Sequence, residues 1–492
     1  MKRADIVFGI LLTIILLLIN WQAVNSYFSQ DDFFHLRQVL DKNFFDLPKF
    51  FLPWNDLGYA FYRPLSREVL GFFMYNLFGL NPFPYHLLNM TVILLIGMLL
   101  YRLVGLWVEN KFVQLIAVMF YILSAVHNVE LYYLSSIQTL LASMFSLVSL
   151  INYSKYLMNG ERRNYFISVV FFLFGLFSHE SAVVTLAIIA LFRVFFEKEL
   201  NLGISVKVFN DLKWFLGVAL FRVIIYLFIT QLPREAVYAP SFLLKNILNT
   251  TSWYVLWVIG LPEMLVDFMT LTLSFNPNFF KWYPNYAYFA FPALSVFILA
   301  FIYFAITSKK VFLSKNLILF VLAFFVSLLP YIFFPMHKFI YYLSLPSVFF
   351  SAALGILIGS NFRDNKKERL ILFISFLSFT IVSFNTALIN KDTYWASKRA
   401  KAAQVLVSKT KKEYPSPPKN SVFFIKNDPN YPEISEEWGS SSKQAFYILS
   451  GSDAFQLIYK DPSINVLYED VDNNVKGVEY GSYYTLNATF PY

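Results

Sequence analysis

The chain has 492 residues, of which 57% are hydrophobic, 20% are aromatic and only 14% are charged, with a net charge of +9 and no cysteine. A soluble chain of this size carries roughly 25% charged residues, and single hydrophobic cores stop growing at about 250–300 residues. The composition therefore indicates a polytopic membrane protein. It excludes a cytosolic enzyme, a secreted domain, a nucleic-acid-binding protein, disulfides and thiol catalysis.

About eleven transmembrane helices are expected, because a membrane span needs about 20 apolar residues. The first follows Met1-Lys2-Arg3 and has no small-residue cleavage site, so we expect a retained span rather than a signal peptide. The apolar stretch 164–197 is broken by Ser178-His179-Glu180-Ser181, which predicts a helical hairpin. The predicted helices are 5–23, 84–107, 112–127, 135–153, 164–178, 181–197, 213–231, 286–306, 316–335, 339–360 and 369–389.

The distribution of Lys and Arg predicts the orientation of these helices. One set of loops is basic, whereas the short loops 128–134, 178–181 and 336–338 carry only Lys338. By the positive-inside rule, the N-terminus is cytoplasmic and the C-terminus lies outside. The proline-rich segment 232–285 then crosses the membrane zero or two times, and we expect a re-entrant or interfacial element on the outer face.

Two long segments are predicted on the outer face. The first outer loop, 24–83, is amphipathic and aromatic, which favours a position on the membrane surface; its aromatic residues include Phe33, Phe34, Phe44, Phe45, Phe50, Phe51 and Trp54. The transmembrane domain, 1–389, is followed by 390–492, whose composition predicts a small extracytoplasmic α/β domain. The predicted elements of this domain are helices at 393–411, 442–449 and 453–459 and strands at 421–425 and 464–468.

Ionisable residues are predicted to cluster at the outer mouth of the helical bundle. Charged groups at membrane depth are expensive, so this convergence favours a functional site, although packing explains any single interfacial histidine equally well. The clustered residues are His35, His86, His127, His179 and His337, the acids Asp31, Asp32, Glu130 and Glu180, and the cations Arg37, Arg63, Arg67 and Lys338.

The pair Asp31-Asp32 is the sharpest feature of this cluster. Adjacent carboxylates repel, which raises the pKa of one toward the range of a general base, or they hold a divalent cation such as Mg²⁺ or Mn²⁺. The alternative is a surface pair that caps the helix beginning near Phe33. Glu130, predicted in the next outer loop, is a candidate second acid facing the pair.

Two cations are candidate anion anchors. Arg63 can grip a phosphate with two parallel hydrogen bonds, and Lys338 acts as a point charge in an otherwise uncharged loop. His179-Glu180 lies between two apolar helices, where either a functional pair or a structural ion pair is expected. Tyr341 and Tyr342 fit an interfacial aromatic belt equally well.

Two nucleotide-binding motifs are absent, because the chain has no Walker loop and no Gly-rich dinucleotide turn. It also lacks the hydrolase motifs HExxH and GxSxG. An enzyme on the outer face without a cytosolic nucleotide needs an activated substrate that is already there. Lipid-linked donors meet that requirement.

Several stretches resemble the GT-C superfamily of membrane glycosyltransferases, in its protein O-mannosyltransferase-like and aminoarabinose-transferase-like branch. The similarity lies in the acidic pair of the first outer loop and in four further stretches. The chain departs from the family at two positions: His179 stands where those proteins often have Lys, and Lys338 stands in place of an Arg. These stretches are Tyr62-Arg63-Pro64-Leu65, 78–89, His127-Asn128-Val129-Glu130 and 337–342 followed by Leu345-Pro346-Ser347.

The resemblance implies an inverting glycosyltransferase of a bacterial or archaeal cell membrane. Such enzymes move a monosaccharide from a polyprenyl-phosphate donor to an acceptor hydroxyl on a lipid, glycan or protein, and some hold a divalent cation at the acidic pair. One of Asp31 and Asp32, preferably Asp31, is the expected general base, assisted by Glu130. The resemblance assigns the donor phosphate to Lys338, Arg63, His337 and Tyr342, and the sugar or acceptor to His35, His86, His127, His179 and Glu180.

Two alternatives remain at this stage. One is a different outer-face enzyme acting on lipid-linked glycans, such as a ligase or polymerase. The other is a non-enzymatic lipid or glycan translocase, which needs polar residues along the whole path through the bundle. The helices at 84–107 and 316–335 are nearly free of ionisable residues in their inner halves, and no inverted repeat is visible.

Overall fold

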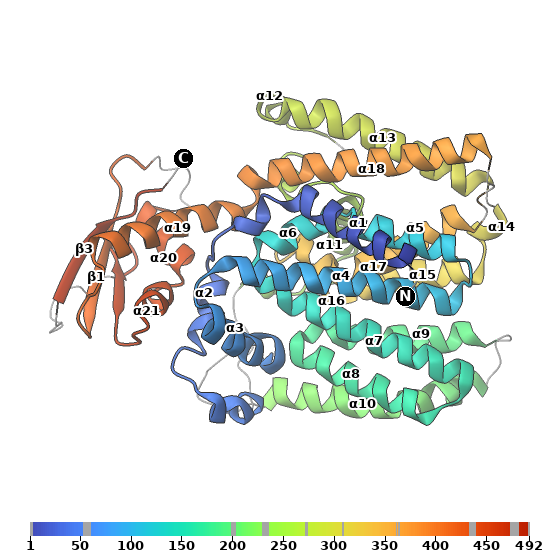
Figure 1. Cartoon of the computed structure of the whole chain (residues 1–492), viewed down its shortest axis with the longest axis horizontal. Helices are drawn as coiled ribbons and strands as arrows, with labels where there is room; N and C mark the ends of the chain where they lie inside the picture. The colour runs from blue at the N-terminus through green and yellow to red at the C-terminus, as the bar shows by residue number, and fades with distance from the viewer. Residues whose placement is uncertain are drawn as a thin grey trace.

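A computed structural model shows a helical bundle joined at one end to a small domain containing a β-sheet (Figure 1). The structure describes residues 3–52, 61–197, 203–228, 236–270, 274–307, 309–360, 362, 365–431, 439–472 and 482–490. Helix α19 (Trp395–Glu413) leads from the bundle into the small domain.

Every predicted apolar stretch contains a helix. Within the described residues, six helices are long and apolar enough to cross a membrane, or seven if a bent pair forms one span. The count of eleven spans is not confirmed, but the apolar helices are those of an integral membrane protein. The bundle helices are α1 (Arg3–Asn20), α4 (Pro82–Trp107), α5 (Lys111–Ile122), α6 (Val126–Tyr132), α7 (Ile137–Asn159), α8 (Arg162–Ser178), α9 (Val184–Phe196), α10 (Gly203–Phe228), α13 (Pro284–Thr307), α15 (Lys315–Ser327), α16 (Leu329–Ile332), α17 (Ser344–Gly359) and α18 (Lys366–Thr393), with α14 (Lys309–Phe312) as a short connector.

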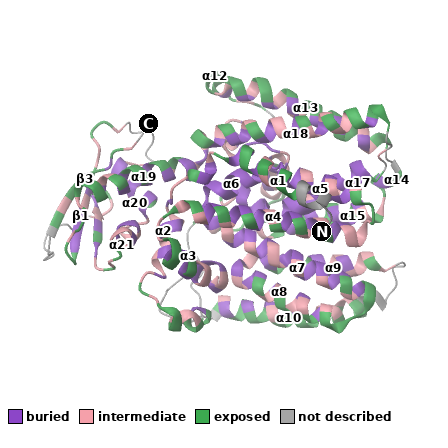
Figure 2. Cartoon of the chain, in the orientation of Figure 1, coloured by how far each residue is buried: buried purple, intermediate pink, exposed green. Residues whose placement is uncertain are grey.

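Small residues allow close contact between two helices of the bundle. Helix α17 packs against α5 and α15 at the centre, where Figure 2 shows most buried residues. Helices α10 and α13 carry exposed apolar side chains. A Cβ atom added at Gly355 would lie 2.7 Å from the Val113 carbonyl oxygen. Glycine therefore lets the two backbones approach, as is typical of membrane helix interfaces.

The predicted helix at 112–127 is interrupted. Helix α5 ends at Ile122 and α6 begins at Val126, with a bend of 46° between them. Residues 128–134, predicted as a loop, are mostly helical instead: they lie largely in α6 and in the short helix η4 (Leu134–Ser136), and they are buried. The predicted break at residues 178–181 is confirmed, because α8 ends at Ser178 and the short helix η5 (Glu180–Val183) follows.

The first outer loop is largely helical. Its elements are η1 (Ala23–Asn25), α2 (Asp31–Arg37), η2 (Phe44–Phe51), the π-helix η3 (Pro64–Val69) and α3 (Leu70–Phe78). Phe33 and Phe50 are buried, while Phe45 is 86% exposed, so the aromatic residues divide between the core and the surface. Trp54 lies outside the described residues.

The segment 232–285 contributes helices that cover the bundle near α16 and the short helix η8 (Ile340–Leu343). Trp253, Tyr254 and Trp257 are buried, so this apolar run packs against protein. The helices are η6 (Ala236–Tyr238), α11 (Leu244–Val258), η7 (Glu263–Asp267) and α12 (Asn278–Trp282).

The C-terminal region contains a three-stranded parallel sheet in the order β2-β1-β3. Strand β1 pairs with both neighbours, with Phe423 opposite Val466 on one side and Tyr484 on the other. The sequence did not predict β3. The elements after α19 are β1 (Ser421–Lys426), α20 (Ser441–Leu449), α21 (Asp453–Tyr459), β2 (Asn465–Tyr468) and β3 (Ser482–Asn487).

Candidate active site

A cavity of about 970 Å³, here called the central cavity, lies where α2, η3, η4, η5, α10 and η8 converge. Segments far apart in the sequence supply its polar side chains. The ionisable residues other than tyrosine that line it are Asp31, His35, Arg63, Arg67, His179, Glu180, Arg222 and His337, and the tyrosines are Tyr133, Tyr226, Tyr238, Tyr331, Tyr341 and Tyr342. The structure thus brings together most of the predicted cluster.

The two adjacent aspartates have different environments. Asp31, the first residue of α2, lines the central cavity, and its Oδ2 accepts a hydrogen bond of 2.6 Å from the Tyr133 hydroxyl. Successive helical residues point about 100° apart, so Asp32 faces the protein instead. Asp31 is therefore the carboxylate of the pair that reaches the cavity.

Asp32 attaches α2 to the bundle. Its carboxylate accepts hydrogen bonds from the Ser135 amide at 2.9 Å, the Ser135 hydroxyl at 2.6 Å and the Ser29 amide at 3.0 Å. Burial raises the pKa of Asp32 to about 7, and these hydrogen bonds from Ser135 and Ser29 oppose the rise. This buried, fully engaged carboxylate fits an anchoring role.

Arg63 and Glu180 form a bidentate ion pair at the cavity wall. Arg63 Nε and Nη2 lie 2.9 and 2.5 Å from the two Glu180 oxygens, and Nη1 donates to Gln138 Oε1 at 2.6 Å. Burial alone would raise the pKa of Glu180, but Arg63 and His179 lower this pKa by more than burial raises it. The pKa of Glu180 therefore lies well below its ordinary value. The pair therefore holds both charges fixed beside the cavity.

Arg222 is a cavity residue that the sequence analysis missed. It lies on α10, is only 6% exposed, and contacts the Tyr62 carbonyl oxygen through Nη2. Its Nε and Nη1 are buried and have no hydrogen-bond partner within the part of the chain that the structure describes. The signal was present, because Arg222 is the only charged residue between Lys213 and residue 231 of an apolar stretch, and such a residue marks a functional site by default.

Three histidines line the central cavity with their rings engaged. His35 Nδ1 lies 3.0 Å from Ser135 Oγ, and His337 Nε2 lies 2.8 Å from the Tyr342 hydroxyl. Burial lowers the pKa of His337 to about 4 and that of His179 to about 3, and it also lowers the pKa of His35. All three are therefore neutral at pH 7, as is suited to binding sugar hydroxyls rather than phosphate.

Besides Asp32, four predicted site residues do not line the central cavity. Lys338 donates to the Pro335 carbonyl oxygen at 2.7 Å, so the predicted phosphate role is not carried forward. His86 is fully buried, with Nε2 lying 2.8 Å from the Ser26 carbonyl oxygen. His127 and Glu130 are also fully buried, so the geometry does not support the predicted sugar or acceptor contact of His127 or the predicted catalytic role of Glu130.

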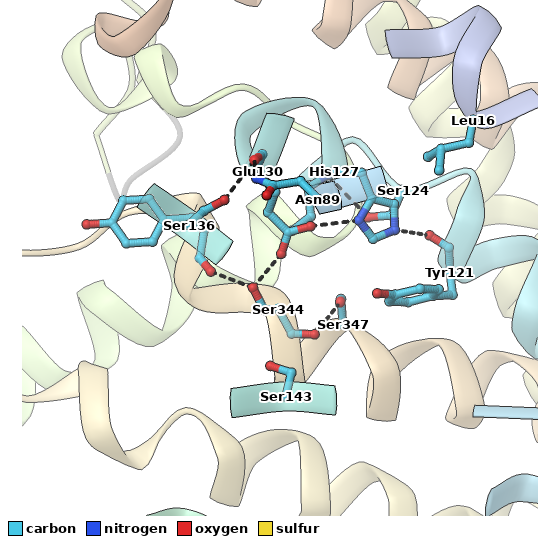
Figure 3. Close-up of polar contacts among 12 residues, drawn as sticks. Leu16, Asn89, Tyr121, Ser124, His127, Glu130, Ser136, Ser143, Ser344 and Ser347 are labelled. Carbon is cyan, nitrogen blue, oxygen red and sulfur yellow. Dashed lines mark hydrogen bonds and ion pairs between the residues drawn. The ribbon is translucent and has the colours of Figure 1, made fainter. Parts of the chain in front are cut away.

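His127 and Glu130 belong to a buried polar network instead (Figure 3). His127 Nδ1 lies 2.8 Å from Glu130 Oε2, and its Nε2 lies 2.7 Å from the Tyr121 carbonyl oxygen. The Ser344 hydroxyl donates to Glu130 Oε1, and the Ser136 hydroxyl donates to the Glu130 carbonyl oxygen at 2.7 Å. The network holds the α5–α6 bend against η4 and α17, and η4 in turn carries the Ser135 that binds Asp32.

We expect Glu130→Ala to destabilise the fold by about 2–4 kcal/mol, because it leaves His127 and Ser344 buried without their partner. The expected readout is a lower midpoint of thermal unfolding in detergent, with the transfer rate per folded molecule largely retained. Glu413→Ala, at the exposed end of α19, is the control. A stable Glu130→Ala protein without activity would return Glu130 to the catalytic residues.

A divalent cation at the acidic pair does not fit the donor set. Among the residues that the structure describes, no group of three or more His, Asp or Glu side chains is placed to hold a metal ion. Both oxygens of Asp32 already accept hydrogen bonds from Ser29 and Ser135. No step is therefore assigned to a metal.

The fold is similar to that of an archaeal oligosaccharyltransferase. The chain matches the enzyme of Archaeoglobus fulgidus, solved with a tethered acceptor peptide containing the NVT sequon, with a TM-score of 0.50 and 13% identity over 94% of this chain. It spans 64% of that protein's length. The apo form of the same enzyme and AglB of A. fulgidus, in complex with an inhibitory peptide and a dolichol-phosphate, match with TM-scores of 0.47 and 0.46 at 12% identity, over 94% of this chain and 65% and 64% of theirs.

This likeness shows a fold shared with that enzyme and nothing finer. No protein-family model matches the chain, and no curated protein matches it. The O-mannosyltransferase-like branch is not confirmed.

Proposed function

We propose that the protein is an inverting glycosyltransferase that moves a sugar from a polyprenyl-phosphate donor to an acceptor hydroxyl on the extracytoplasmic face. One observation carries the proposal: a single cavity holds Asp31 together with three arginines from two distant segments. A carboxylate base and a cationic phosphate site are the two elements that this reaction needs. The GT-C-like fold supports the same reaction class.

Asp31 is the proposed general base. As the acceptor oxygen attacks the anomeric carbon, its proton passes to Asp31, while the bond from that carbon to the phosphate oxygen breaks with its electron pair on the phosphate. Attack on the face opposite the leaving group inverts the configuration. The hydrogen bond from Tyr133 to Asp31 Oδ2 orients the carboxylate for this step.

Arg222 and Arg63 are the proposed anchors of the donor phosphate. The two buried N–H groups of Arg222 without partners are the donors that a phosphate oxygen would satisfy. Glu180 holds Arg63 in place through two hydrogen bonds. Preorganised cations stabilise the charge that develops on the leaving phosphate.

The wall of the central cavity near Arg222 suits the lipid chain of the donor. Ala219 and Val223 on α10 line the cavity, and Val223 is 45% exposed. The surrounding surface of α10 is apolar, with Leu220, Phe221, Ile224 and Leu227 exposed. A polyprenyl chain can therefore pass from the cavity into the bilayer beside α10.

The size of the transferred glycan separates this proposal from a second candidate. The second candidate is the transfer of a whole lipid-linked oligosaccharide, and the fold likeness to an oligosaccharyltransferase is the observation that favours it. Neutral histidines and tyrosines in the central cavity fit sugar hydroxyls in either case. The mass added to the acceptor, one monosaccharide or a block, decides between them.

The test is donor turnover by the purified full-length chain in liposomes. We expect release of polyprenyl phosphate from a sugar-charged donor when an acceptor hydroxyl is supplied. Failure to bind or consume any polyprenyl-phosphate sugar would reject the proposal. In the proposed topology, the transmembrane domain ends at residue 389 and the two termini lie on opposite sides of the membrane. Protease access to residues 390–492 in oriented vesicles tests this topology.

A further inference from the structure

The residue before the proposed base has an unusual backbone conformation. Gln30 has φ of +47° and ψ of −113°, a region that side-chain-bearing residues rarely occupy. An N-cap residue normally has an extended backbone and caps the helix with its side chain, but the Gln30 side chain makes no such bond. Something outside α2 must hold this conformation.

The C-terminal region supplies the contacts that hold Gln30. The Gln30 amide donates to the Ile448 carbonyl oxygen of α20 at 2.8 Å. Arg399 of α19 donates to Gln30 Oε1, and its guanidinium lies 5.2 Å from the centre of the Trp395 ring. Both the backbone and the side chain of Gln30 are thus bound by the small domain.

The other end of α2 is held by the same region. The Arg37 guanidinium donates to Gln456 Oε1 on α21, and α2 packs directly on α21. Figure 1 shows α2 between the helical bundle and the sheet domain. The bundle reaches α2 from the opposite side, through the bonds of Asp32 and Asp31 described above.

We propose that Gln30 and Arg399 are positioning residues, through which the C-terminal region fixes the orientation of Asp31. This inference rests on the proposed function only for its catalytic readout. The strained turn at Gln30 aims the first residue of α2 at the central cavity, and Arg399 keeps the turn in that conformation. Without the contact between Arg399 and Gln30, α2 stays attached to the bundle but can rotate the Asp31 carboxylate away from the central cavity.

The test uses two substitutions, Gln30→Gly and Arg399→Ala, and only the first relieves the backbone strain at residue 30. Glycine adopts positive φ freely, so Gln30→Gly relieves the backbone while removing the Arg399 contact. We expect its thermal midpoint to equal or exceed that of the wild type, while kcat falls about 10-fold or more because the base is misplaced. KM for the donor stays within about 2-fold, because Arg63 and Arg222 are untouched. Arg399→Ala should lower kcat similarly, and Arg399→Lys should restore part of it.

The control is Lys398→Ala, which removes an exposed side chain next to Arg399. Hydrogen exchange of residues 31–37 gives a readout that does not need activity: we expect faster exchange in Gln30→Gly and Arg399→Ala, and unchanged exchange in α7. Unchanged exchange of α2 in both variants would overturn the inference, and so would wild-type kcat in both. If the wild type transfers no sugar, the proposed function fails, and the exchange result alone decides whether Gln30 and Arg399 position α2.

Discussion

Asp31→Asn should abolish sugar transfer, lowering kcat by about 10²–10⁴-fold, which is the range that a general base contributes. The amide keeps the size of the side chain and the hydrogen bond to Tyr133, but it cannot take the acceptor's proton. Donor binding should be retained, because the phosphate anchors lie on other segments. The measurement is release of polyprenyl phosphate under saturating donor, alongside a binding assay.

Asp392→Asn is the matched control, since this exposed aspartate on α18 lies outside the central cavity. Asp32→Asn should behave differently from Asp31→Asn: an amide cannot accept from all three donors that Asp32 engages, so it should lower the thermal midpoint first. Full transfer by Asp31→Asn would reject the base assignment. A stable but inactive Asp32→Asn protein would move the role of base to Asp32.

Arg222→Gln should reduce kcat/KM by about 10²-fold or more, because a cation that stabilises the leaving phosphate is lost. Stability should stay unchanged or rise, since two buried N–H groups of Arg222 have no hydrogen-bond partner among the described residues and a neutral side chain costs less to bury. Opposite effects on activity and stability are the signature of a functional charge. Thermal unfolding and initial rates at low donor concentration measure both.

The matched control for Arg222 is Lys338→Gln, which should stay within about 2-fold of the wild-type kcat/KM. Lys338 is half-buried and bonded to the Pro335 carbonyl oxygen, outside the central cavity. A larger loss in Lys338→Gln than in Arg222→Gln would show that the phosphate site lies nearer to Lys338. Wild-type activity in Arg222→Gln would remove Arg222 from the site.

Sequence alone predicted the class of protein, the positions of the apolar helices and two of the three strands in the tail, β1 and β2. These features follow from local composition and periodicity, which act over one element at a time. The acidic pair and Arg63 were also found from sequence, since charged residues near a bilayer are costly wherever the chain folds. The strand β3 was missed, because its pairing with β1 depends on a segment some 60 residues away in sequence.

Only the tertiary structure decided which polar residues share a cavity. The adjacent Asp31 and Asp32 are equivalent in sequence, yet α2 turns one toward the central cavity and the other toward Ser135. Glu130 lies in α6, the second helix of a bent pair, rather than in a loop, and Arg222 reaches the cavity from a helix that the sequence marked only as apolar. The physical reason is that a side chain's direction and its partners depend on how helices are bent, rotated and packed, and those angles result from contacts between residues far apart in the chain.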